Sequence, residues 1–254
     1  MADKRMTYGE HLEELRRRLT FSMLVLVLTT AFSFVIAERW LFPLIKAPAP
    51  DDIQFVTLDP TGNIGPYIRL SLTSGVILGM PFVLLQIALF ITSALGDREK
   101  RFVLLMIPVV LLFFFGGIAF GYFVILPPAV DFMLSYGSES IAVITPAISR
   151  YISMVTTLLF WLGVAFEIPP AIYVLARIGV VSSKWLISNW RIMLVGAFVL
   201  GAVITPTADP VNQALVSVPL IFLYLFGIVL ARIAEAQRRS AAARQAKIAA
   251  SQAG

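Results

Sequence analysis

The feature that most constrains this chain is a series of six long stretches that are almost free of charged residues. A helix needs about 20 mainly apolar residues to cross the roughly 30 Å hydrocarbon core of a bilayer. The stretches that meet or approach this length are residues 19–37, 70–96, 102–130, 151–176, 192–208 and 210–231. With 59% hydrophobic and 14% charged residues among 254, the chain is too apolar for a soluble domain. The sequence therefore predicts an all-α polytopic membrane protein, with six transmembrane helices in a concave bundle.

The basic residues divide unequally between the two sides of such a bundle. When alternate loops are assigned to opposite sides, 16 of the 20 lysines and arginines fall on the side of both termini. The other side holds Arg39, Lys46, Arg69 and Arg150. Because loops rich in Lys and Arg stay in the cytoplasm, both termini are predicted to be cytoplasmic. The basic residues lie in short loops beside the spans rather than in one patch, so no nucleic-acid partner is expected.

Glu167 is the acidic residue inside the fourth stretch, and Pro169 and Pro170 follow it closely. A charged side chain at membrane depth costs about 2.5 kcal/mol or more, and is tolerated where it faces a bundle interior or a wet cavity. The prolines lack a backbone N–H, so the helix is predicted to bend or loosen there. Two interpretations stay open. The carboxylate lines a functional cavity, or it reaches from a helix end toward the lipid headgroups.

Two further segments flank the spans. Residues before position 19 are predicted to form a short amphipathic helix, whose polar face carries Glu10, Glu14 and Arg17 or Arg18 near i, i+4 spacing. Charges that pair within the helix, together with a basic membrane anchor, would produce the same pattern. Residues 1–232 are therefore expected to form the transmembrane domain, with this helix at its start. Residues 233–254 are predicted to be a basic cytoplasmic tail, partly helical and otherwise disordered. The fifth stretch is short, since its 17 residues cover about 25 Å.

The sequence lacks the residues that several kinds of chemistry require. The chain has no cysteine, which excludes disulfides, thiol catalysis and cysteine-ligated metals. Its single histidine, His11, lies outside the apolar stretches, and no P-loop pattern occurs. No enzymatic activity, metal or cofactor is therefore expected. A proton-coupled carrier of small solutes remains an alternative, because one buried acid beside a broken helix suits that mechanism.

Five ordered motifs point to one family. They are residues 11–19 (HLEELRRRL), residues 43–46 (PLIK), Phe90 with residues 95–101 (LGDREKR), residues 166–169 (FEIP), and residues 195–198 (VGAF) continuing through Thr205 and Pro206 to Asp209 and Gln213. In this combination the chain resembles TatC, the six-span receptor subunit of the twin-arginine protein translocase. The resemblance covers nearly the whole chain apart from the tail.

This resemblance implies a cytoplasmic site for the twin-arginine signal peptides of folded cargo proteins, formed by Glu14, Arg16, Phe90 and Glu99. Guanidinium groups favour carboxylates in a two-bond geometry, and the surrounding lysines and arginines would otherwise repel them. A carrier has no need for acids in two basic cytoplasmic elements, so Glu14 and Glu99 also discriminate between the two functions.

The resemblance assigns roles elsewhere in the chain as well. Single-span partners of the TatA and TatB type are expected to contact polar residues near the short spans, and receptor copies are expected to self-associate. The resemblance also implies that transport is driven by the proton motive force across the cytoplasmic membrane of a prokaryote. The residues concerned are Thr205, Asp209 and Gln213 for the partners, Glu167 and Gln86 as membrane-embedded functional groups, and Pro43 and Pro169 as structural positions.

Overall fold

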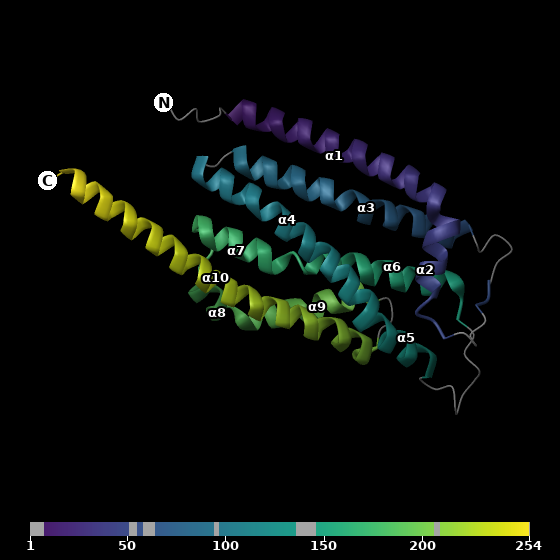
Figure 1. Cartoon of the computed structure of the whole chain (residues 1–254). Helices are drawn as coiled ribbons and strands as arrows, with labels where there is room; N and C mark the ends of the chain where they lie inside the picture. Colours follow the sequence, from purple (N-terminus) through teal and green to yellow (C-terminus); the bar gives the residue numbers. More distant parts are fainter. Residues whose placement is uncertain are drawn as a thin grey trace.

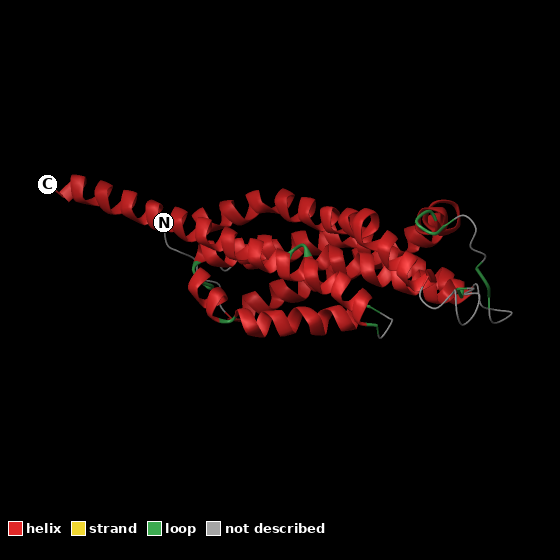
Figure 2. Ribbon diagram, turned by 90° about the horizontal axis from the view of Figure 1, so that it is seen from below, coloured by secondary structure: helices red, strands yellow, loops and turns green. Residues whose placement is uncertain are grey.

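The fold is a bundle of helices that run side by side along one axis (Figures 1 and 2). The computed structural model describes residues 8–50, 55–57, 64–93, 97–135, 146–205 and 209–253. Within them the only β pairing is a single bridge between Val56 and Ala147, where two loops meet. The helices are α1 (Tyr8–Ile36), η1 (Ala37–Leu41), α2 (Phe42–Lys46), α3 (Ile64–Ser93), α4 (Asp97–Phe120), η2 (Gly121–Ile125), α5 (Leu126–Ser135), α6 (Ile148–Ala165), α7 (Ile168–Ile178), α8 (Ser183–Ser188), α9 (Trp190–Ile204) and α10 (Pro210–Ala253).

Five helical segments are long and apolar enough to cross a membrane: Leu12–Lys46, Ile64–Ser93, Lys100–Met133, Ile148–Ile178 and Pro210–Ala241. The expected all-α membrane bundle is thereby confirmed. The sixth candidate, α9, has 15 residues and is about 22 Å long, which is less than the expected length of the fifth stretch. The first helix starts, and the last one ends, at the same end of the bundle (Figure 1), here called the terminal end.

The fourth span is broken where the sequence predicted a bend. Helix α6 ends at Ala165, and α7 starts at Ile168. The turn between them is closed by hydrogen bonds from the backbone N–H of Phe166 and Glu167 to the carbonyls of Leu162 and Val164, at 3.0 and 3.1 Å. The prolines fall in the first turn of α7, where a missing N–H has no helical acceptor to lose.

Helix α6 lies at the centre of the core, between α3 and α4. Its Tyr151 is 1% exposed and donates a hydrogen bond from its hydroxyl to the Ile45 carbonyl at 2.8 Å, which attaches α2 to α6. Pro43 stands in the first turn of α2, and its carbonyl accepts from the N–H of Ala47 at 3.0 Å. These contacts fix the end of the bundle opposite the terminal end.

The tail, expected to be partly helical and otherwise disordered, is part of α10, which continues as a helix to Ala253 and projects beyond the other helices (Figures 1 and 2). Alanine has the highest helix propensity, and extending an existing helix needs no new nucleus. Ala231 and Ala234 are fully buried against α7 and α8. The Glu235 carboxylate accepts hydrogen bonds from the N–H and hydroxyl of Ser183 at 2.6 and 3.0 Å. The start of the predicted tail is therefore part of the packed domain.

Candidate functional site

The site at the terminal end depends on close packing of α1 against α3. Gly75 and Gly79 lie four residues apart on α3, so they face α1 together. A Cβ atom added to Gly75 would lie 2.6 Å from Thr30 Oγ1 and closer still to the Thr30 Cα, and one added to Gly79 would lie 2.7 Å from a methyl group of Leu26. Such pairs of small residues let helix backbones approach closely in membranes. They bring the first turns of α1 beside the last turns of α3.

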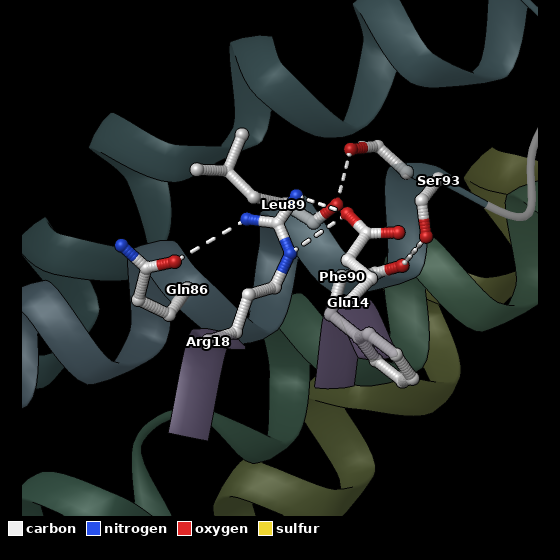
Figure 3. Close-up of polar contacts among 7 residues, drawn as sticks. Glu14, Arg18, Gln86, Leu89, Phe90 and Ser93 are labelled. Carbon is white, nitrogen blue, oxygen red and sulfur yellow. Dashed lines mark hydrogen bonds and ion pairs between the residues drawn. The ribbon is translucent and has the colours of Figure 1, made fainter. Parts of the chain in front are cut away.

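Glu14 and Arg18 form an ion pair where these turns meet (Figure 3). The Arg18 Nε donates to Glu14 Oε1 at 2.9 Å, and Nη2 donates to the same oxygen. The side chains of Arg18 and Glu14 are 17% and 9% exposed. A third donor of this guanidinium, Nη1, reaches across to Gln86 Oε1 on α3 at 3.3 Å. This is the self-paired arrangement that the sequence spacing left open.

The second oxygen of Glu14, Oε2, is buried and makes no hydrogen bond with Arg18. Figure 3 shows it directed toward Ser93, with the Phe90 side chain beside Glu14. The Ser93 hydroxyl donates to the Phe90 carbonyl at 2.7 Å. One oxygen of the carboxylate is therefore bound by Arg18, and the other lies next to the Ser93 hydroxyl.

Two of the expected site residues relate differently to this corner. Arg16 is exposed on another face of α1, because residues two apart on a helix point in nearly opposite directions. It stands beside Leu12 and Leu19 on the outer side. Glu99 lies in the first turn of α4, which starts at the same end of the bundle, but its side chain is outside the described part of the structure.

Glu167 lies in a second place, an apolar groove within the bundle. A groove of about 250 Å³ runs between α3, α4 and α7, lined by apolar side chains that include Leu84, Val110 and Leu175. Of the described residues that line it, Glu167 is the one with an ionisable side chain, and its Oε1 is buried without a partner within the described part of the chain. Gln86 does not line this groove, since its side chain faces Arg18. The two membrane-embedded candidates thus belong to different sites.

Thr205, Asp209 and Gln213 gather at the junction of α9 and α10, at the opposite end of the bundle. The Thr205 hydroxyl donates to the Gly201 carbonyl at 2.8 Å, and the Gln213 amide donates to the Phe198 carbonyl at 3.0 Å. The Asp209 carboxylate accepts from the backbone and side-chain N–H groups of Asn212 at 2.7 and 3.0 Å. Residues 206–208, including Pro206, lie outside the described residues.

The sequence assigned no role to Ser93, Asn212 or Ser183, and it named Arg18 only as a possible partner within its own helix. Spacing of i, i+4 is the signal that identifies Arg18. No local pattern marks Ser93 or Ser183, because each acquires its surroundings from a helix far away in the chain.

Comparisons with known proteins agree on one family. Residues 10–219 match the family model described as Sec-independent protein translocase protein (TatC). The Sec-independent protein translocase protein TatC of Koribacter versatilis is 35% identical over 246 residues, covering 93% of this chain and 89% of that protein. The TatC of Aquifex aeolicus is 36% identical, covering 92% and 98%.

A solved structure supports the same assignment. The crystal structure of a twin-arginine translocase receptor, TatC, superposes with a TM-score of 0.81 at 35% identity. The match covers 89% of this chain and 99% of that one. None of these names supports the small-solute carrier that Glu167 left open.

Proposed function

Because the chain belongs to the TatC family of Sec-independent protein translocase proteins, we propose that it is the receptor subunit that binds twin-arginine signal peptides of folded cargo. It is a multi-pass membrane protein. The binding site comprises Glu14 with Phe90 and Ser93 at the α1–α3 corner, and Glu99 at the start of α4. In this proposal the chain recognises and conducts cargo and is not an enzyme.

The observation that carries the proposal is the guanidinium already bonded to Glu14. Two N–H groups of Arg18 reach one carboxylate oxygen, so the corner has the space and polarity that an arginine head requires. Charge-assisted hydrogen bonds of this kind are about twice as strong as neutral ones. A second carboxylate, Glu99, would serve the second arginine of the peptide.

The terminal end is proposed to face the cytoplasm. The N-terminal part of α1, the end of α3, the start of α4, the loop after α7 and the end of α10 all lie there (Figure 1). When alternate loops are assigned to opposite sides, 16 of the 20 basic residues fall on the side of both termini, so the positive-inside rule favours this orientation. The membrane is then the cytoplasmic membrane of a prokaryote, with both termini inside.

Partner subunits of the TatA and TatB type are proposed to dock beside the short α9. Its 15 residues span less than the hydrocarbon core, which favours local thinning or a neighbouring helix at that position. Thr205, Asp209 and Gln213 would supply polar contacts there. Glu167 would act within the membrane during transport, and copies of the receptor would associate with one another.

The experiment is a binding measurement with the full-length protein in lipid nanodiscs. A labelled twin-arginine peptide is titrated beside the same peptide with both arginines replaced by lysines. Glu14→Gln and Glu99→Gln should each weaken twin-arginine binding by about ten- to a hundredfold, the equivalent of a charge-assisted hydrogen bond of about 1.5–3 kcal/mol.

The matched control is Glu13→Gln, which removes an exposed carboxylate one position from Glu14. It should leave binding within about twofold, since an exposed charge contributes little. Equal affinity for the two peptides, or unchanged binding by both site variants, would reject the proposal.

A further inference from the structure

The Glu14 carboxylate carries a guanidinium before any peptide arrives. Arg18 donates twice to Oε1, and Oε2 is buried. An arriving arginine in two-bond geometry needs both oxygens of the carboxylate. It therefore cannot bind in that geometry while Arg18 stays in place.

We propose that Arg18 is an internal competitor that occupies Glu14 until a twin-arginine peptide displaces it, and that Gln86 holds the displaced guanidinium on α3. The inference rests on the proposed function, and it assigns to Arg18 the control of peptide affinity. Arg18 belongs to the receptor itself, and it contacts the Glu14 carboxylate that is proposed to bind the peptide.

The exchange follows from competition for one carboxylate. Glu14 and Arg18 together are neutral, so an incoming guanidinium meets no uncompensated negative charge at Glu14 while Arg18 stays in place. Removing Arg18 from the carboxylate lets the incoming arginine take over its compensation. The exchange replaces one guanidinium with another, so its free-energy cost is modest. The apparent peptide affinity is then the intrinsic affinity multiplied by the fraction of receptors in which Glu14 is open.

Gln86 gives the displaced side chain a destination. Its Oε1 already accepts from Arg18 Nη1 at 3.3 Å, so Arg18 has one bond on each side of the α1–α3 contact (Figure 3). Loss of the two bonds to Glu14 leaves the bond to Gln86 intact. Because Gln86 is neutral, it holds the guanidinium without competing as strongly as a carboxylate.

The test uses Arg18→Gln in the full-length receptor, with the twin-arginine and twin-lysine peptides as probes. The twin-arginine peptide must displace Arg18 from Glu14, so it should bind the variant about fivefold more tightly, the scale of a partly exposed ion pair. The twin-lysine peptide does not need both oxygens and should gain less. Arg17→Gln is the matched control. It removes the same charge from an exposed neighbour that makes no described hydrogen bond to Glu14, and it should change affinity less than twofold.

A double variant separates competition from general electrostatics. In a Glu14→Gln background, Arg18→Gln should no longer tighten binding, because there is no carboxylate left to release. Weaker or unchanged binding by Arg18→Gln, an equal gain from Arg17→Gln, or a gain that persists without Glu14 would each overturn the competitor role. If Arg18→Gln fails to fold, Arg18→Lys decides in its place. It should tighten binding more than twofold, and no gain overturns the proposal.

Failure of the underlying function has a different signature. In that case the wild-type receptor itself would not prefer arginine to lysine peptides. A wild-type receptor with the preference but without the Arg18 effect would reject the competitor alone.

Discussion

The α1–α3 contact allows one prediction to be worked out from distances. In Gly75→Ala, the new methyl group would lie 2.6 Å from Thr30 Oγ1 and 2.9 Å from Thr30 Cβ. Carbon atoms pack at about 3.5–4.0 Å, so α1 and α3 would have to separate by about 1 Å. Overpacking of this kind typically costs about 1–3 kcal/mol of the free energy of unfolding.

Gly116→Ala is the matched control, since a Cβ there meets nothing within 4 Å. Its free energy of unfolding should stay within about 0.5 kcal/mol of wild type. Both variants are compared by titrating the protein from mild-detergent micelles into sodium dodecyl sulfate and following tryptophan fluorescence.

Peptide affinity provides a second readout of the same substitution. Gly75 lies about three turns from Gln86 on α3, so separated helices would also misalign the Glu14 corner. Gly75→Ala should therefore bind the twin-arginine peptide more weakly than Gly116→Ala does. If the two alanine variants unfold at the same detergent concentration, the close glycine contact does not hold these helices together.

Three further perturbations test other parts of the structure. Glu167→Gln should keep the fold and peptide affinity but impair export of a twin-arginine reporter in cells, because its groove is separate from the Glu14 corner; parallel loss of binding and export would contradict this. Glu235→Ala removes both bonds to Ser183, at a cost of about 1.5–3 kcal/mol, and should speed amide hydrogen exchange in residues 179–183; unchanged exchange would show that the contact does not anchor this loop. Tyr151→Phe leaves the buried Ile45 carbonyl without its donor and should lower the free energy of unfolding by about 1–3 kcal/mol in the detergent titration, whereas wild-type stability would mean that this bond contributes nothing.

The sequence predicted the features that follow from local composition. Apolar length identified five helices long enough to span a membrane and the shorter α9. Pro169 with Pro170 identified the break beside Glu167, because proline chemistry acts on its own helix. The order of the motifs led to the family. The pairing of Glu14 with Arg18 was readable as one option from i, i+4 spacing.

Other features depended on contacts between distant segments. Ser93 and Gln86 approach Glu14 and Arg18 only because Gly75 and Gly79 let two helices come close. The tail was expected to be only partly helical because it is a basic, alanine-rich segment with no large apolar face to dock. Its first turns are nevertheless packed through small alanines, including Ala234, and through a carboxylate that finds its donors 52 positions away.

Because α10 is one continuous helix, a small tilt of its membrane-embedded part produces a larger displacement at its far end. This single helix connects the membrane core, where Gly227 lets it lie against Ile172 of α7, to the exposed Ala250 and Ser251. The part beyond Ala231 is about 33 Å long, so a tilt of about 5° in the core would move the far end by about 3 Å. A spectroscopic label at Ala250 would therefore report small rearrangements of the membrane-embedded helices, because they appear as a larger displacement of the label outside the bilayer.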